Sequence, residues 1–315
     1  MRTDFSAHHF LALAGGVGGA KLAHGLAQIL PPQALTILVN TGDDFEHFGL
    51  TICPDLDTVC YTLAGVANPE TGWGRREETW RALENVAKLG GPTWFRLGDQ
   101  DLGTHLERTR RLRNGERLTQ ITLDFCRAWG IQHPILPMSD EPLRTIVSTV
   151  EYGELPFQEY FVKYACQPRV RGFRFEGAAQ PRPVPEALEA LSRSAAVIVC
   201  PSNPWVSIDP ILSIYRPYLP KEKPILAVSP IIGGQAVKGP AAKMFAELGI
   251  PPSALAVAEH YRGLVTHFVL DRTDAHLTEA ITALGMRVLV TGTLMKDEAD
   301  RRRLAEDVLN FVLQS

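Results

Sequence analysis

A glycine-rich run near the start of the chain is the first place where residue types and spacing could do chemistry. Residues 15–21 (GGVGGAK) follow the apolar segment FLALA at 10–14 and precede residues with helical spacing. Glycines let the backbone approach a phosphate closely, and a helix start offers free N–H groups and positive potential. The run matches neither the G-x-G-x-x-G nor the G-x-x-x-x-G-K-[ST] fingerprint. We therefore expect a phosphate-binding loop of another kind, with a tight turn as the alternative.

Four aspartates crowd the next polar segment, which we expect to be a loop over residues 41–58. Asp43 and Asp44 follow the apolar run LTILVN at 35–40, and Asp55 and Asp57 come just beyond. Carboxylates so close together repel one another unless a cation is present, and oxygen ligands beside a phosphate suit Mg²⁺. The alternative, capping of the next helix by Asp55 or Asp57, would leave Asp43 and Asp44 unexplained.

Further polar residues stand at other segment ends. Arg96 precedes two carboxylates around Gly98 and could pair with a phosphate or stack on a flat ring. His105 is expected to be structural, and the basic run from Arg108 to Arg113 is expected to be a solvated helix face. Ser202 and Asn203 follow the strand-like AAVIVC (195–200), and Gly233 and Gly234 follow PILAV (224–228). Such hydroxyl, amide and glycine groups together suit a large nucleotide-type ligand.

The elements that position these groups alternate between strand and helix. We expect strands at 10–14, 35–40, 195–200, 224–228, 266–270 and 287–290, with a further short strand at 135–138 (ILPM). We expect helices at 20–30, 59–66, 75–90, 101–113, 116–129, 186–193, 206–218, 239–248, 275–284 and 297–313. This alternation predicts an α/β fold with a Rossmann-like, doubly wound, mostly parallel sheet. Ligands of such sheets bind outside the carboxyl ends of the strands, where the polar segments fall.

The chain divides into four predicted parts. Residues 1–10 form an N-terminal tail with His8 and His9 in solvent, and 11–144 form a Rossmann-like nucleotide-binding part. Residues 145–185 form a smaller inserted, strand-rich α+β segment that ends in a proline-rich linker. Residues 186–315 form the second half of the α/β domain.

Composition excludes several classes of protein. Of 315 residues, 45% are hydrophobic and 21% are charged, which excludes a disordered chain. The net charge of −3 argues against a nucleic-acid partner, and no apolar run reaches the roughly 18 residues of a membrane span. The five cysteines form no C-x-x-C pair, and the first ten residues do not resemble a signal peptide. We expect reduced thiols and a cytoplasmic location.

Several motifs in order carry a resemblance to a known family. They are GGVGGAKLAHGL, VNTGDDF, CPDLDTVCYTLAG, GDQDLGTH, LPMSDEP, PSNPWVSIDPIL and SPIIGGQAVKGPAAK. From about Leu13 to Leu309 the chain resembles the 2-phospho-L-lactate transferase family of coenzyme F(420) biosynthesis. GGVGGAK alone would not be specific, but the motifs together are.

The resemblance implies a magnesium-dependent reaction. A phosphoenolpyruvyl- or 2-phospholactyl-type group, or a glyceryl form in some bacteria, moves from a guanosine-diphosphate-linked donor to the ribityl hydroxyl of the deazaflavin alcohol Fo. GMP leaves, and F(420)-0 or its dehydro form is the product. The family also implies a Rossmann-like fold, a deazaflavin-binding role for part 11–144, and a homodimer. The sequence does not choose the three-carbon acid.

The resemblance also implies roles for individual residues, by their positions in the matched motifs. Asp43 and Asp57 are expected to bind Mg²⁺ or orient the attacking hydroxyl, with Asp44 and Asp55 as second choices. Asp57 and Arg96 match the positions with which the family holds Fo. The residues expected to hold the guanosine diphosphate are Gly15, Gly16, Gly18, Gly19, Ser202, Asn203, Gly233 and Gly234.

Two other functions stay open at this point. The YvcK-type gluconeogenesis factors of the same superfamily bind a UDP-sugar and regulate without catalysis. The second carboxylate pair and the GDQDLGTH segment with Arg96 upstream favour the transferase. A nucleotide-dependent oxidoreductase is the third possibility, but the G-x-G-x-x-G fingerprint is missing.

Overall fold

The centre of the molecule is a seven-stranded sheet in which every pair of neighbouring strands is parallel. The computed structural model describes residues 5–177 and 181–314. The strand order is β14-β13-β10-β9-β1-β2-β5. The strands are β1 (His9–Ala14), β2 (Leu35–Val39), β5 (Ile135–Pro137), β9 (Ser194–Val199), β10 (Ile225–Val228), β13 (His267–Asp271) and β14 (Arg287–Thr291). The predicted α/β fold with a parallel central sheet is confirmed.

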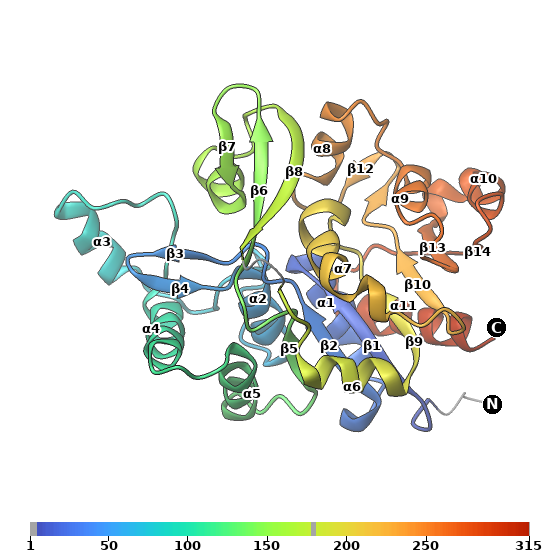
Figure 1. Cartoon of the computed structure of the whole chain (residues 1–315), viewed down its shortest axis with the longest axis horizontal. Helices are drawn as coiled ribbons and strands as arrows, with labels where there is room; N and C mark the ends of the chain where they lie inside the picture. The colour runs from blue at the N-terminus through green and yellow to red at the C-terminus, as the bar shows by residue number, and fades with distance from the viewer. Residues whose placement is uncertain (1–4, 178–180, 315) are drawn as a thin grey trace.

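Helices cover both faces of this sheet (Figure 1). Along β1, Phe10 and Ala12 pack on one face while Leu11 and Leu13 pack on the other, so the strand is apolar throughout. One face carries α1 (Gly16–Ala27), α2 (Pro54–Leu63), α5 (Leu118–Ala128) and α11 (Glu298–Leu313). The other carries α6 (Pro185–Arg193), α7 (Asp209–Tyr215), α8 (Ala241–Glu247), α9 (Ala254–His260) and α10 (Thr278–Thr282).

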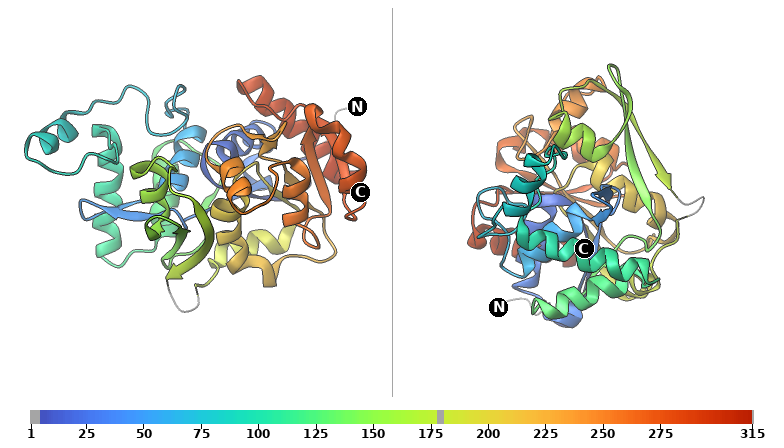
Figure 2. Two further views of the ribbon diagram at one scale, coloured as in Figure 1. Left: turned by 90° about the horizontal axis from the view of Figure 1, so that it is seen from above. Right: turned by 90° about the vertical axis from the view of Figure 1, so that its left-hand side faces the viewer.

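Two excursions leave the sheet. After β2 come the antiparallel hairpin β3 (Phe45–His47) and β4 (Leu50–Ile52), then α2, α3 (Arg81–Lys88) and α4 (Asp99–Arg113). Helix α3 projects farthest from the sheet (Figures 1 and 2). The second excursion is an antiparallel sheet of β6 (Leu143–Thr149), β7 (Gly153–Pro156) and β8 (Val170–Gly177), with a π-helix at Glu159–Lys163. A small hairpin of β11 (Ile231–Ile232) and β12 (Gln235–Ala236) follows β10.

Short helical turns complete the element set. They are 3₁₀-helices at Pro32–Ala34, Arg216–Tyr218 and Arg272–Leu277, and a second π-helix at Pro204–Ile208. The expected helix at 206–218 is therefore a run of π, α and 3₁₀ turns around α7. Within the described ranges, no helix combines the length and apolar composition needed to cross a membrane.

Several predicted boundaries are wrong. The expected loop 41–58 contains β3, β4 and the start of α2, which begins at Pro54 rather than at residue 59 because proline suits the first helical turn. The expected helix 75–90 is helical only over Arg81–Lys88. Strands β3 and β4 were missed because three-residue strands show no clear alternation, and the seven-residue α9 was missed for the same lack of length.

The N-terminal tail is shorter than predicted. His9 and Phe10 are the first residues of β1, and His9 is buried, with its ring nitrogens 3.1 Å from Ser194 Oγ and 3.0 Å from Thr36 Oγ1. Neighbouring strands thus satisfy a histidine that we expected in solvent. Residues 178–180 of the predicted insertion and linker lie outside the described residues, and the other part boundaries stay predictions.

Candidate functional site

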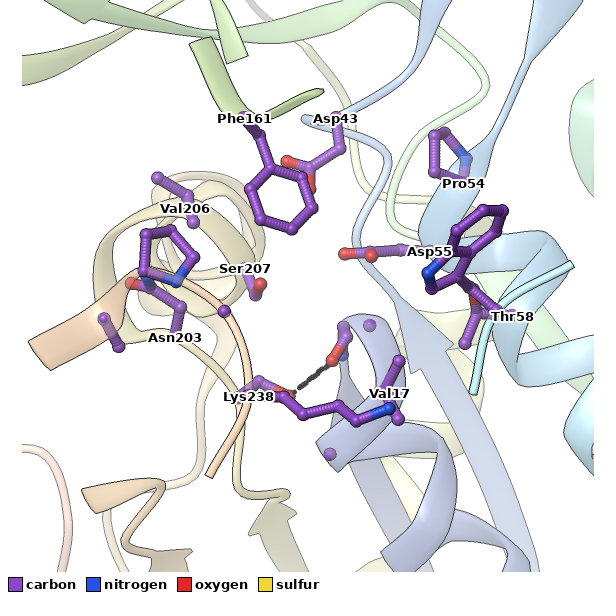
Figure 3. A pocket seen from close by; sticks show the side chains of 18 of the residues that line it. Val17, Asp43, Pro54, Asp55, Thr58, Phe161, Asn203, Val206, Ser207 and Lys238 are labelled. Atoms are coloured by element: carbon purple, nitrogen blue, oxygen red, sulfur yellow. Dashed lines mark hydrogen bonds between the residues drawn. The ribbon is translucent and has the colours of Figure 1, made fainter. Parts of the chain in front are cut away.

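A cavity of about 640 Å³ opens at the carboxyl ends of the parallel strands. Its walls come from the loops after β1, β2, β9, β10 and β14, and from the two excursions (Figure 3). The volume lies within the roughly 300–1,000 Å³ range of ligand pockets. The chemistry-bearing segments predicted to meet at this edge therefore share one cavity.

The glycine-rich run closes one side of this cavity. Gly15 is the N-cap of α1, and the Ser202 hydroxyl donates to the Gly15 carbonyl oxygen at 2.7 Å. A Cβ on Gly18 would lie 2.2 Å from the Pro201 carbonyl oxygen, so the first turn of α1 touches the loop after β9 through backbone. Gly15, Gly16 and Gly18 line the cavity, as do Ser202 and Asn203. A helix start and a close backbone approach give this wall the features of a phosphate-binding site.

Asp43 and Asp55 form a pair of buried carboxylates on the adjoining wall. Asn40 Nδ2 donates to Asp55 Oδ2 at 2.9 Å, while Asn40 Oδ1 accepts from the Gly42 backbone N–H at 2.8 Å. Asp43 Oδ1 is buried without a hydrogen-bond partner. Figure 3 shows both carboxylates pointing into the same region, with Ser207 nearby.

A positive charge beside this pair would stabilise the ionised form of both carboxylates. Burial, followed by the negative charge of Asp55, raises the pKa of Asp43 well above its usual range. Burial also raises the pKa of Asp55 to about 6, against the effect of hydrogen bonds from Asn40 and the Gly16 backbone. Two buried carboxylates with an orphaned oxygen fit a hard cation such as Mg²⁺, which binds one or two carboxylates and keeps waters or phosphate oxygens.

Asp57 lies in the first turn of α2 and already has a cationic partner. The buried Arg108 guanidinium binds both carboxylate oxygens, with Nη1 donating to Oδ2 at 3.0 Å and Nη2 donating to Oδ1. The prediction that Arg108 belongs to a solvated helix face is wrong, because this side of α4 packs against β4 and α5. Its neighbours Arg110 and Arg111 instead pair with Glu107 and Glu116 nearer the surface.

Asp57 also belongs to a second cluster of ionisable side chains, together with Asp101 and His105. Ligand atoms of Asp57, Asp101 and His105 lie within 4.8 Å of one another, so these residues could hold a metal. His105 Nε2 is 3.3 Å from Asp101 Oδ1, and the Tyr61 hydroxyl donates to the same oxygen at 2.6 Å. Arg108 already supplies positive charge here, whereas the charges acting on Asp43 are negative.

Another part of the cavity lining is aromatic and includes Arg96. The Arg96 guanidinium lies 4.1 Å from the Trp80 ring centroid, and the neighbouring Trp94 and Phe95 pack against Phe45 of β3. Trp94, Phe95 and Arg96 all line the cavity. Rings and a planar guanidinium suit recognition of a flat, polycyclic ligand.

Four predicted site residues lie outside the cavity lining. They are Asp44, Gly19, Gly233 and Gly234. Asp44 is buried behind the wall, where burial raises its pKa to about 7 despite the opposing charge of Arg144. Gly233 and Gly234, with φ of +56° and +77°, form the β11–β12 turn, and Gly233 N–H donates to Asp274. The neighbouring Ile232 and Lys238 line the cavity instead.

Sequence reasoning missed several residues that build the site. Arg108 and Tyr61 hold the acidic groups, and Phe157, Gln158 and Phe161 reach the cavity from the antiparallel insertion. Helical spacing carried a usable signal for Arg108, since residues 101, 105 and 108 lie on one face of a helix. No local pattern indicated that residues of the insertion reach this cavity.

Known proteins resemble this chain over nearly its whole length. The sequence profile of the family described as 2-phospho-L-lactate transferase CofD matches residues 10–299. A phosphoenolpyruvate transferase of Streptomyces griseus is 40% identical over 309 residues, which cover 96% of this chain and 97% of that relative. A 2-phospho-L-lactate transferase of Methanopyrus kandleri is 40% identical over 306 residues, covering 95% and 96%.

A solved structure has the same fold. The crystal structure of a member of the UPF0052 family from Bacillus halodurans has a TM-score of 0.62 at 13% identity, covering 97% of this chain and 99% of that chain. Identity so low supports the fold alone. The profile match and the close relatives go further and confirm the resemblance seen in the motifs: the chain belongs to the 2-phospho-L-lactate transferase (CofD) family of enzymes.

Proposed function

We propose that this transferase moves a phosphoenolpyruvyl- or 2-phospholactyl-type group from a guanosine-diphosphate-linked donor to the ribityl hydroxyl of Fo, in a magnesium-dependent reaction of coenzyme F(420) biosynthesis. The hydroxyl oxygen forms a bond to the phosphorus that carries the three-carbon acid. The bond from that phosphorus to the GMP oxygen breaks, and GMP leaves. The product is F(420)-0 or its dehydro form.

One observation carries the proposal. A single cavity is lined by the glycine run at the start of α1, by aromatic residues with Arg96, and by the buried Asp43–Asp55 pair. A nucleoside diphosphate suits the glycine run, and a deazaflavin ring suits the aromatic residues with Arg96. The transferred group would then pass the acidic pair, where its phosphate and the incoming hydroxyl meet.

Each group has a proposed task. Asp43 and Asp55 would hold Mg²⁺, which supplies Lewis-acid stabilisation of phosphate charge when bound. Gly15, Gly16 and Gly18 would lie against the diphosphate, where the lack of side chains allows a close backbone approach, and Asp57 with Arg96 would bind Fo. Asp43 and Asp57 stay the two candidates for accepting the hydroxyl proton. Positioning and electrostatics dominate such phosphoryl chemistry, so no covalent enzyme intermediate is required.

The identity of the three-carbon acid stays open. The chain is 40% identical both to a relative named phosphoenolpyruvate transferase and to one named 2-phospho-L-lactate transferase. Substrates that differ by one small group are separated by only ~1–3 kcal/mol unless a hydroxyl is specifically bonded. The homodimer implied by the family is likewise a prediction, which light scattering would check.

A turnover assay tests the proposal. Purified protein is mixed with Fo, Mg²⁺ and each guanosine-linked donor in turn, and products are separated by fluorescence chromatography and weighed by mass spectrometry. We expect a phosphorylated deazaflavin that is lost on addition of EDTA. Asp57→Asn should lose turnover or Fo binding, whereas Asp140→Asn, outside the cavity lining, should keep both. Absence of product with every donor, with stabilisation by a UDP-sugar, would favour a regulatory protein instead.

A further inference from the structure

Arg108 differs from the other arginines of α4 in what surrounds it. Its side chain is only 2% exposed, whereas Arg110 is 60% exposed and Arg111 is 13% exposed. Arg108 does not line the cavity, but its partners Asp57 and His105 do. A buried cation thus stands directly behind two groups of the cavity wall.

The hydrogen bonds of Arg108 set the orientation of both partners. Its two terminal nitrogens bind the two oxygens of Asp57, which fixes the plane of that carboxylate. Arg108 Nη1 is also 3.2 Å from His105 Nδ1. Because a guanidinium only donates, Nδ1 must be the acceptor, and a neutral His105 carries its proton on Nε2, facing Asp101 Oδ1 at 3.3 Å.

Stability alone does not account for such an arrangement. Burying an ion pair costs several kcal/mol of desolvation per ion, and well-packed apolar residues often stabilise a protein as much or more. What the pair supplies here is a carboxylate held in a fixed plane at the cavity wall. Its remaining lone pairs are available to a hydroxyl or ring N–H in the cavity.

We propose that Arg108 is a positioning residue, which acts by holding Asp57 as a fixed hydrogen-bond acceptor for the hydroxyl-bearing substrate. This inference rests on the proposed function, in which that substrate is Fo. Loss of the two-pronged contact lets the Asp57 carboxylate rotate, and misplacement by about 1 Å costs roughly 100-fold in rate. Arg108 hydrogen-bonds to Asp57 and His105 rather than to the glycine run, so binding of the guanosine-linked donor along that run should not depend on this contact.

The test compares two arginines of one helix. Arg108→Lys keeps the charge but removes the planar fork, and we expect kcat/KM for Fo to fall by roughly 10–100-fold while KM for the donor stays unchanged. The matched control is Arg111→Lys, because Arg111 also binds two carboxylates, of Glu116 and Asp124, away from the cavity. It should keep wild-type kinetics.

A second variant shows whether Arg108 acts through Asp57. The neutral pair Asp57→Asn/Arg108→Gln removes both charges of the buried ion pair together, so it should fold even if Arg108→Lys does not. Its KM for Fo and its kcat should equal those of Asp57→Asn alone. A further loss in the double variant, or an Arg108→Lys protein with wild-type kinetics for Fo, overturns the inference. Failure of the wild type to use Fo at all would instead refute the proposed function.

Discussion

The four buried aspartates near the cavity differ in the charged groups that surround them. Asp57 is bound by Arg108, and the charge of Arg144 acts on Asp44, but the charges acting on Asp43 are those of Asp55 and Asp44, all negative. The four aspartates that look alike in the sequence therefore fall into different environments. Of these four aspartates, Asp43 and Asp55 line the cavity without a cationic side chain acting on them.

The raised pKa of Asp44 predicts a pH dependence of stability. Its pKa is about 7 in the folded protein against an ordinary 3.8, so the folded state holds this proton more tightly than the unfolded chain. The contribution of Asp44 to the free energy of unfolding therefore falls as pH rises from about 4 to about 7. Asp44→Asn should gain stability relative to wild type across this window, by up to about 1.4 kcal/mol per pH unit. Urea unfolding at several pH values measures it, and parallel curves would contradict it.

Gly18 predicts a strong steric effect of one methyl group. A Cβ there would lie 2.2 Å from the Pro201 carbonyl oxygen, so Gly18→Ala must push the first turn of α1 and the loop after β9 apart. We expect a loss of about 1–3 kcal/mol of stability and weaker binding of a guanosine nucleotide. Gly103→Ala in α4 is the control, since its Cβ meets nothing within 4 Å and alanine favours helix by ~1 kcal/mol. Equal melting temperatures for the two variants would refute the steric argument.

At the scale of elements, α3 and the start of α4 cap each other. The Asp99 carboxylate accepts from the backbone N–H groups of Arg81 and Ala82, at 3.1 and 3.0 Å. In return, Glu78 accepts from Gln100 N–H at 2.6 Å and Asp101 N–H at 3.2 Å. These hydrogen bonds join the projecting segment around α3 to α4, the helix that carries Asp101, His105 and Arg108.

The capping exchange predicts different consequences for two similar variants. Asp99→Ala should detach the start of α3 from α4. It should also raise KM for Fo, because Arg96 of the cavity lining stacks on Trp80, the residue before α3. Asp297→Ala removes the N-cap of α11. In the wild type, the Asp297 side chain accepts a hydrogen bond from Asp300 N–H at 2.8 Å. Each should lower the stability of the protein, but only the first should change KM and speed hydrogen exchange of 81–88. Unchanged KM in Asp99→Ala would show that α3 does not support the site.

At the scale of the whole molecule, the cavity is assembled from both halves of the chain. The glycine run and the aspartates come before the antiparallel insertion, whereas Ser202, Asn203 and the segment from Thr293 to Met295 come after it. A ligand that fills the cavity contacts both halves and binds only the folded state, so it should stabilise the whole protein.

Ligand-dependent melting tests this consequence. GDP with Mg²⁺ should raise the free energy of unfolding by about 2.7 kcal/mol at 100 times its Kd, and EDTA should reduce the effect. A UDP-sugar serves as the comparison ligand and should stabilise less. Stabilisation by the UDP-sugar but not by GDP would contradict the proposed donor class.

Local patterns were sufficient for the sheet, the glycine run and the family. Strands buried on both faces read as continuous apolar runs, and polar residues at their carboxyl ends mark the ligand edge of a parallel sheet. That is why Gly15, Asp43, Asp55, Asp57 and Ser202 could be predicted to meet, and why they do line one cavity.

Charge pairing and access to the cavity were decided by packing between distant segments. Arg108 is 51 residues from Asp57 and joins it only because α4 packs against β4 and α5, which no local pattern encodes. Gly233 and Gly234 look like a phosphate cradle in sequence, but the β11–β12 pairing places them in a turn outside the cavity. Residue type sets what a group can do, whereas burial and neighbours set its charge and its exposure to a ligand.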